Sequence, residues 1–392
     1  MLICGIDIAK NNHEASLIDE SGKLLSKSLR FTNDSIGAAA LLDYLAKLNP
    51  DNQDIVIGME ATGHYWLALY SFLFEKGFTV HVINPIQTDA LRNVFIRKTK
   101  NDSKDSHLIA EAVRMGYTSS TLLPEDAMLG LRQLCRHRTD LVDFTSELKC
   151  KIIGLLDRIF PEYSKLFSDT FGKSSVELLS QHTTPEEIAS LSAKKLAALL
   201  GKCSRGRFGT QKAEQIKAAA KNSFGIKLGA DIFALQIRQL LEQIALVEDQ
   251  ISVIEAEMDH RLSSLNSFIT TIPGIGSVLG ASIISEIGDI STFTSAEKLV
   301  AFAGIDPSVV QSGDFEGTRG KMSKRGSPHL RRALWLAAQC AAMQDGSIFR
   351  AYYLKKISEG KHHFTAIGAV ARKLTYTVFA VLRDNKPYVP IA

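Results

Sequence analysis

The chain has few cysteines, and they do not form a recognisable metal or disulfide pattern. Its 392 residues contain five cysteines, scattered and odd in number, with no CxxC pair among them. This usage argues against a disulfide framework and against a structural zinc site, and it is typical of a reducing compartment. The sequence therefore predicts a cytoplasmic protein.

Long apolar runs are missing as well. No stretch of about 18 uninterrupted apolar residues, the length at which a membrane-spanning helix is suspected, occurs in the sequence. The N-terminus enters a strand-like segment without a basic leader or the apolar core of a signal peptide. We therefore expect no membrane partner and no exported form.

The excess of charge of one sign is small. A net charge of +4 and a pI near 8.6 are only mildly basic, so any affinity for nucleic acid must come from local clusters. A composition of 45% hydrophobic and 22% charged residues is that of an ordinary folded protein. At about 150 residues a domain, the length predicts two or three domains.

The first part of the chain alternates apolar strands with helices. Strands are predicted at residues 2–8, 14–19, 24–31, 55–60 and 78–83, and helices at 35–48, 64–75 and 85–95. Three strands followed by this alternation are the layout of a ribonuclease-H-like (RuvC-like) α/β domain, which we place at residues 1–125. A doubly wound sheet would also alternate in this way, but its Gly-rich phosphate loop is missing.

Four carboxylates stand where this layout would bring them together. Asp7 and Glu60 each end an apolar strand, and Asp102 and Asp105 stand three apart, on one face of a predicted helix start. Helix N-termini tolerate acids in any case, so the last two alone indicate only a solvated first turn. Together the four offer oxygen ligands, which suit Mg²⁺ or Mn²⁺ and disfavour zinc. Two such ions can clamp a scissile phosphodiester.

Two heptad patterns follow this domain. Apolar residues step by threes and fours from Leu131 to Ile159 and again from Ile237 to Met258, which predicts long coiled-coil helices. With the segment between them they form a region that we place at residues 126–265. The pattern is compatible with an antiparallel arm, with dimerisation helices and with an ordinary helical bundle.

Basic residues gather in local clusters. Nine Lys or Arg stand against one acid from Lys194 to Lys227, and six stand against none from Arg319 to Arg332. Clusters as one-sided as these, in a nearly neutral chain, indicate contact with phosphate. The side chains that we expect to bind nucleic acid are Arg97, Lys98, Lys100, Arg205, Arg207, Lys321, Lys324, Arg325 and Arg331.

A mostly helical region follows, which we place at residues 266–392, with helices expected at 278–287, 296–303, 330–343 and 365–383. Its Pro273-Gly274-Ile275-Gly276 turn resembles a helix-hairpin-helix, in which glycine N–H groups face a nucleic-acid phosphate. Gly274 and Gly276 are therefore further candidates for nucleic-acid binding, although a turn this short is a weak signal.

Several motifs, in their order and spacing, resemble one family. They are Gly5–Lys10, Glu60–Gly63, Lys100–Asp105, Ile272–Gly276, Ser312-Gly313 and Ser323–Gly326. Over nearly its whole length the chain resembles the DEDD-class insertion-sequence transposases, now described as bridge-RNA-guided DNA recombinases. The resemblance implies a RuvC-like domain, a coiled-coil dimerisation region and a C-terminal transposase domain.

The resemblance also implies a serine nucleophile in the last domain. We assign this role to Ser312, within Gln311-Ser312-Gly313, with Ser308 and Ser323 as alternatives. Because a serine hydroxyl needs a metal or a base to activate it, the resemblance suggests a composite site of the four acids and Ser312. The implied partners are donor and target DNA, a guide (bridge) RNA, and further copies of the chain in a dimer or tetramer.

Three functions are compatible with these residues. The first is a recombinase that joins DNA through a phosphoserine, with sites chosen by an RNA. The second is a RuvC-like nuclease of the Holliday-junction-resolvase type, which hydrolyses DNA with the same acids. The third is a nucleic-acid-binding protein without enzymatic activity, against which the placement of the four acids weighs.

Overall fold

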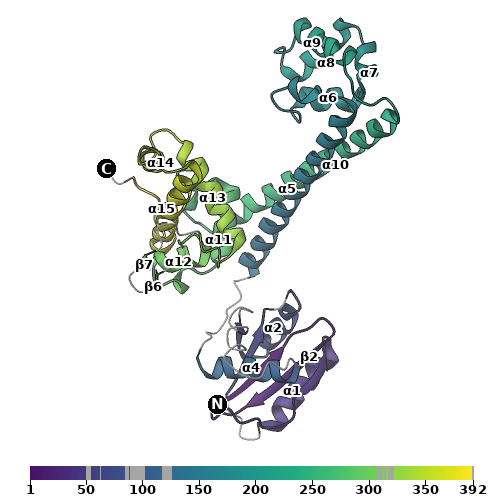
Figure 1. Cartoon of the computed structure of the whole chain (residues 1–392). Helices are drawn as coiled ribbons and strands as arrows, with labels where there is room; N and C mark the ends of the chain where they lie inside the picture. The colour runs from purple at the N-terminus through teal and green to yellow at the C-terminus, as the bar shows by residue number, and fades with distance from the viewer. Residues whose placement is uncertain are drawn as a thin grey trace. The chain divides into compact units, whose positions relative to one another are not determined.

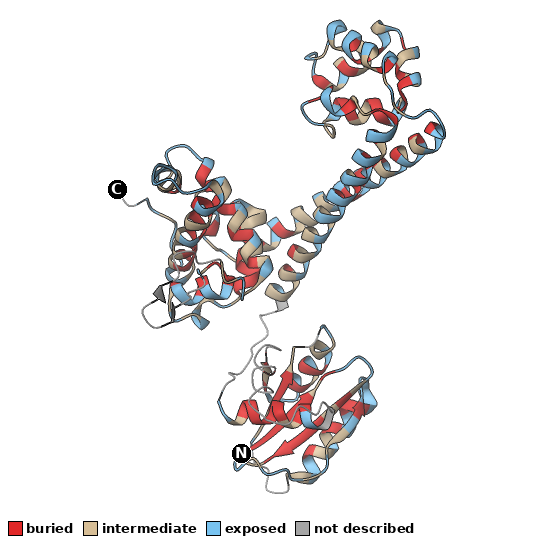
Figure 2. Cartoon of the chain, viewed as in Figure 1, coloured by how far each residue is buried: buried red, intermediate tan, exposed pale blue. Residues whose placement is uncertain are grey.

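The structure is a computed structural model that describes residues 1–49, 54–61, 63–83, 88, 102–116, 126–307, 311–312, 315–316 and 322–390. The chain divides into two compact units, Met1–Leu123 and Pro124–Ala392. Both units are drawn in Figure 1. Each has its own buried apolar core, shown in red in Figure 2.

The first unit contains a mixed five-stranded sheet. Its strands are β1 (Leu2–Asp7), β2 (Asn12–Ile18), β3 (Leu29–Thr32), β4 (Ile55–Glu60) and β5 (Thr79–Ile83), in the order β3-β2-β1-β4-β5. β1, β4 and β5 are parallel, whereas β2 pairs antiparallel with β1 and β3. The predicted α/β class of this part is confirmed.

The third strand is shorter than the predicted 24–31. Asp19 accepts the backbone N–H groups of Ser21 and Lys23 at 2.9 and 3.0 Å, which closes a turn after β2. Beyond it, Leu24 makes only an isolated bridge to Ile18. The Leu25 N–H still donates to the Leu17 carbonyl at 3.1 Å, but the continuous ladder with β2 begins only at Leu29.

Helices cover both faces of the sheet. α1 (Ser35–Leu48) and α2 (Trp66–Glu75) pack on one face, and α4 (Asp102–Arg114) packs on the other. α1 starts where it does because Asp34 accepts the Gly37 N–H at 2.8 Å, as an N-cap residue should. The helix predicted at 85–95 lies outside the described residues, apart from Thr88.

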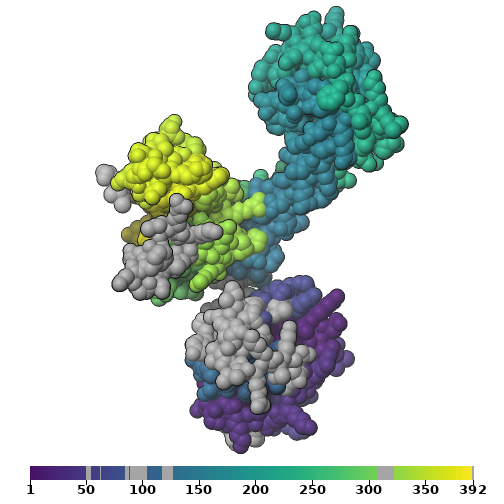
Figure 3. Space-filling model, viewed as in Figure 1, coloured from purple at the N-terminus to yellow at the C-terminus, as the bar shows by residue number. Residues whose placement is uncertain are grey.

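The second unit is built on two long helices that lie side by side, α5 (Asp126–Ile159) and α10 (Ala230–Ser264). Figure 3 shows the same pair in space-filling form. Ion pairs between Arg138 and Glu255, at 2.7 Å, and between Lys149 and Glu248, at 3.5 Å, show that they run antiparallel. The predicted long helices are therefore present in the antiparallel arrangement. Whether they supercoil as a coiled coil stays a prediction.

Four shorter helices cap one end of this pair. They are α6 (Lys173–Gln181), α7 (Pro185–Ser190), α8 (Ala193–Ser204) and α9 (Thr210–Lys221). A shared core, which includes Ile152 of α5, Leu178, Leu196 and Ile237 of α10, ties them to both long helices. We call these four helices, the loops between them and the segments that join them to α5 and α10 the arm tip.

The remaining helices pack at the other end of the pair. They are α11 (Ser277–Ile287), α12 (Ala296–Ala303), α13 (Pro328–Met343), α14 (Ile348–Ser358) and α15 (His363–Asp384), with 3-10 turns η1 (Tyr163–Lys165), η2 (Ile269–Thr271) and η3 (Ile290–Thr292) elsewhere in the unit. α14 was not among the helices predicted from the sequence. α15 is long and apolar enough to cross a membrane by length and composition, but half of its most apolar window is buried here, as in the core helix of a folded protein.

A buried ion pair fastens the long helices to this C-terminal group. Glu286 of α11 is 5% exposed and receives Arg136 of α5 at 2.7 Å, together with the hydroxyl of Ser327 at 2.9 Å. Burial raises the pKa of Glu286, but the bonds from Arg136 and Ser327 outweigh it and hold that pKa below its usual value. Removing Arg136 would leave a buried carboxylate without its partner.

The domain boundary predicted at 265/266 stays a prediction, since one compact unit spans it.

Candidate active site

Two strand ends bring Asp7 and Glu60 to one edge of the sheet. β1 and β4 are parallel, with Ile6 opposite Met59. The next residue on each strand is an acid, so Asp7 and Glu60 end adjacent strands side by side. Side chains alternate along a strand, and Ile3, four residues before Asp7, packs against α4. Asp7 therefore lies on the α4 side of the sheet.

The first turn of α4 lies at this same edge. The hydroxyls of Ser106 and Ser16 form a buried hydrogen bond of 2.7 Å, which joins that turn to β2. A Cβ on Gly5 would come within 2.1 Å of the Ser106 carbonyl oxygen, so the helix rests on the backbone of β1. Further along, Ile109 packs with Ile3 near the start of β1. α4 thus runs antiparallel to β1, with its N-terminus toward the carboxyl end of that strand.

The acids differ in exposure and in their neighbours. Asp105, in the first turn of α4, is buried at 8% exposed, while Asp7 and Glu60 are half-buried. Thr88 is 1% exposed, and its hydroxyl donates to Oε2 of Glu60 at 2.9 Å. That bond holds the carboxylate in one orientation. Asp102 is the first residue of α4, as predicted, and the structure describes its backbone only.

The oxygen-only donor set of this edge fits a hard divalent cation better than zinc. Among the side chains that the structure describes, no three His, Cys, Asp or Glu come close enough together to hold a metal ion. The side chain of Asp102 is not one of these. The four-carboxylate site therefore stays a prediction, with Asp7, Glu60 and the start of α4 at one edge in its support.

Thr88, Ser16 and Ser106 were missed by reasoning from the sequence. Gly5 and Gly58, which face each other on β1 and β4, carried a usable signal, because glycine inside a strand often marks a close approach of another backbone. Nothing comparable marks Thr88, whose partner is 28 residues away.

The predicted nucleophile, Ser312, belongs to a two-stranded ribbon. β6 (Gln311–Ser312) pairs antiparallel with β7 (Phe315–Glu316), with Ser312 opposite Phe315. Toward the base of the ribbon, the Ser323 N–H donates to the Asp306 carbonyl at 2.9 Å, and the Ser323 hydroxyl donates to the Asp306 carboxylate. Ser312 is thus near the turn of the ribbon and Ser323 is at its base. Ser308 lies outside the described residues.

The basic residues around the ribbon have unequal surroundings. Lys324 and Arg325 are exposed. Arg331 donates to the carbonyls of Ala303, at 3.1 Å, and Gly326, at 3.4 Å, so its guanidinium supports the loop. The side chains of Arg97, Lys98, Lys100 and Lys321, which were also predicted to bind nucleic acid, lie outside the described residues.

The two glycines of the predicted hairpin also differ. Gly274 has φ +84°, and a Cβ there would come within 2.5 Å of the Ala341 nitrogen on α13. Gly274 is therefore required for packing, whatever else it does. Gly276 precedes α11 and has open space around the position of a Cβ. A role in nucleic-acid binding stays a prediction for both, as does the helix-hairpin-helix.

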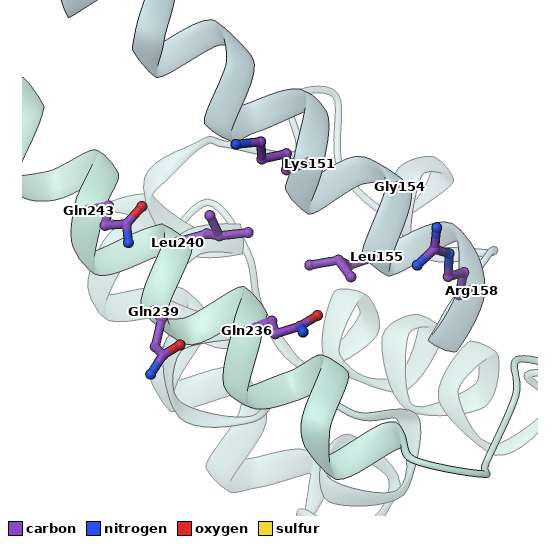
Figure 4. Close-up of a pocket in the computed structure, with 8 residues that line it drawn as sticks. All are labelled: Lys151, Gly154, Leu155, Arg158, Gln236, Gln239, Leu240 and Gln243. Atoms are coloured by element: carbon purple, nitrogen blue, oxygen red, sulfur yellow. The ribbon is translucent and has the colours of Figure 1, made fainter.

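The two long helices line an open cavity of about 460 Å³ near the arm tip. Figure 4 shows Lys151, Leu155 and Arg158 of α5 facing Gln236 and Leu240 of α10 across it. No carboxylate lines this cavity, so it offers no alternative metal site. Its lining cannot supply the chemistry of the acidic sheet edge.

Comparisons with known proteins decide the family. Residues 4–161 match a family described as transposase, and residues 266–354 match the transposase IS116/IS110/IS902 family. The chain belongs to the IS110/IS116 transposase family. It is a DNA transposase or recombinase of an insertion sequence, and the resemblance seen in its motifs is confirmed.

Several relatives of this transposase match it over almost its whole length. It is 27% identical to an uncharacterized protein of insertion element IS116 from Streptomyces clavuligerus, over 98% of this chain and 96% of that one. It is 25% identical to a pilin gene-inverting protein of Moraxella bovis over the same shares. The Thermus thermophilus RuvC in complex with a Holliday junction substrate matches 31% of this chain and 99% of its own, at 13% identity and a TM-score of 0.24. A TM-score this low does not establish a common fold.

Proposed function

We propose that this transposase cuts and rejoins DNA through a covalent bond to Ser312, aided by divalent metal bound to Asp7, Glu60, Asp102 and Asp105. The observation that carries the proposal is the sheet edge where β1 and β4 end beside the first turn of α4. The strand order supports a RuvC-like first unit, since β2 alone runs against the other central strands. Family membership supports the use of these acids on DNA.

The chemistry conserves the energy of the phosphodiester. The Ser312 hydroxyl gives up its proton and its oxygen bonds to phosphorus. The bond from phosphorus to one strand's oxygen breaks at the same time, and that leaving oxygen takes up a proton. In the second step a strand's hydroxyl attacks the phosphoserine, which restores the Ser312 hydroxyl and forms a new DNA linkage. Mg²⁺ or Mn²⁺ at the four acids would activate the attacking hydroxyl and stabilise the leaving oxygen.

Partners belong to the same proposal. Donor and target DNA would be recombined, a guide RNA would choose the sites, and two or four copies of the chain would assemble in the cytoplasm. The support is the family and the one-sided basic clusters, of which the one at residues 194–227 lies on the arm tip.

A hydrolytic RuvC-like nuclease is the second candidate. It needs only the acids of the first unit, where β1 and β4 end beside the first turn of α4. The acids alone would then activate water, and no covalent intermediate would form.

Denaturing electrophoresis of a DNA cleavage reaction separates the two candidates. The recombinase should leave labelled DNA attached to protein after denaturation, and a protease should remove the shift. Cleavage without any attached protein would assign the transposase to the hydrolytic class.

Thr88 offers a test of the acidic edge itself. Thr88→Val removes the hydroxyl that donates to Glu60 while it keeps the shape of the side chain. We expect the metal concentration for half-maximal activity to rise about 10-fold. This is the smaller end of the loss in metal affinity that is typical when a hydrogen bond that orients a metal ligand is removed. Thr88→Ser, which keeps the donor, should restore it. A purely structural role would instead lower the melting temperature and leave the metal dependence unchanged.

A further inference from the structure

The arm tip contains a cavity that the proposed chemistry does not use. It has a volume of about 330 Å³ and lies between the start of α6 and the turn that follows α8. Its lining includes Lys173, Arg205, Arg207, Phe167 and Phe208. Three cationic side chains and two aromatic rings around one hollow are the combination that binds a nucleotide, through its phosphate and its base.

The two arginines are placed there by an unusual turn. Arg205, which ends α8, has a left-handed backbone with φ 54°, and Gly206 follows with φ 80°. A non-glycine residue in this region is uncommon and costs energy. The turn sets both Arg205 and Arg207 at the cavity. Throughout the described part of the chain, neither guanidinium forms an ion pair.

The opposite wall adds partial positive charge. α6 begins at Lys173, and its N-cap residue, Gly172, has no side chain to cap the first turn. Gly172, Lys173 and Ser174 all line the cavity. The one acid in the lining, Asp169, already accepts the Phe171 N–H at 2.9 Å. The balance of charge around the cavity is therefore strongly positive.

An aromatic surface completes the cavity. The rings of Phe167 and Phe208 meet edge to face, with centroids 6.0 Å apart. Lys212 lies 5.6 Å from the Phe167 centroid and 6.0 Å from that of Phe208. Phe208 is only half-buried, so part of its surface remains open to a ligand. It can pack against a base or a ribose whose phosphate the arginines hold.

We propose that this cavity binds one unpaired nucleotide of an RNA, with its phosphate between Arg205, Arg207 and the start of α6 and its base against Phe208. A hollow admits a nucleotide that is splayed out of a loop or bulge, whereas the backbone of a duplex cannot enter it. The choice of RNA rests on the proposed function, in which an RNA is a partner of the chain.

The test measures binding of the full-length protein to a fluorescent single-stranded RNA of mixed sequence, by anisotropy at several salt concentrations. Arg205→Glu with Arg207→Glu should weaken binding at least about 10-fold and lower the salt slope by about 0.7, since the cavity holds one phosphate and each phosphate of a single strand that is no longer neutralised accounts for about 0.7. The matched control is Lys194→Glu with Lys195→Glu. It changes the net charge by the same amount, on exposed residues of α8 that do not line the cavity. The control pair should reduce the affinity much less.

Phe208→Leu is a second variant, which keeps an apolar side chain but removes the ring. It should weaken RNA binding and leave the salt slope unchanged, because both arginines still neutralise the phosphate. Single-stranded DNA and duplex DNA of the same sequence serve as competitors, and both should compete more weakly than the RNA.

The outcomes distinguish this proposal from the proposed function. Equal reductions in affinity for the two charge-reversed pairs would show a diffuse basic surface and overturn the cavity site, while the RNA partner would stand. Preference for either DNA competitor would overturn the choice of RNA at this site. If the wild type binds no RNA at all, both the cavity proposal and RNA guidance fail, and the serine chemistry is still decided by the covalent adduct.

Discussion

Ser312→Ala is expected to give neither a covalent protein–DNA adduct nor recombinant DNA, a loss of about 10⁴-fold or more, as for other nucleophile deletions. Without the Ser312 hydroxyl, the protein has no oxygen at this position that can attack the phosphorus of the DNA strand. The backbone pairing of Ser312 with Phe315 does not depend on the side chain, so the ribbon should survive. DNA binding, measured by gel shift, should remain near that of the wild type.

The matched control is Ser323→Ala. It removes a hydroxyl from the same ribbon, one that donates to the Asp306 carboxylate. We expect this variant to keep the adduct. An adduct that persists in Ser312→Ala and maps by mass spectrometry to Ser308 or Ser323 would show that another serine is the nucleophile.

Changing any one of the four acids to Ala should reduce recombination below detection, that is, by about 10³-fold or more, because each charge helps to stabilise the transition state. The four acids are Asp7, Glu60, Asp102 and Asp105. A divalent ion that loses one of so few carboxylates is under-coordinated. Recombination of a plasmid substrate, measured against added metal, should require Mg²⁺ or Mn²⁺, and Zn²⁺ should not replace them.

Asp43→Asn is the control for this set. Asp43 is an exposed acid of α1, which packs on the face of the sheet opposite α4. Its loss should leave recombination and metal dependence unchanged. Full activity of the wild type in a strong chelator would contradict the metal requirement for all four acids.

Much of the fold could be predicted from the sequence, because its strands and long helices follow regular apolar patterns. β1 and β4 are continuous apolar runs that end in an acid, so both the strands and the positions of Asp7 and Glu60 followed from the pattern. The long helices followed from the heptads, although their antiparallel pairing depended on contacts such as Arg138 with Glu255. Periodicity reports which face of an element is buried, and not which element covers it.

Contacts made by single polar residues could not be predicted in this way. The bond from Thr88 to Glu60 and the bond from Ser106 to Ser16 join residues that are distant in sequence and belong to no repeating pattern. The requirement for glycine at position 274 comes from α13, which is more than 50 residues further along the chain. These features depend on tertiary structure alone.

The paired long helices also set a distance. α5 and α10 have 34 and 35 residues, so the pair extends for about 50 Å at 1.5 Å per residue. That is roughly the length of 15 base pairs at 3.4 Å each. An RNA held at the arm tip is therefore anchored well over one turn of duplex away from the far end of the pair. Because the seam between the helices repeats every seven residues, removing seven residues from each would keep the seam and shorten this reach by about 10 Å. The length of the pair can therefore be changed one heptad at a time.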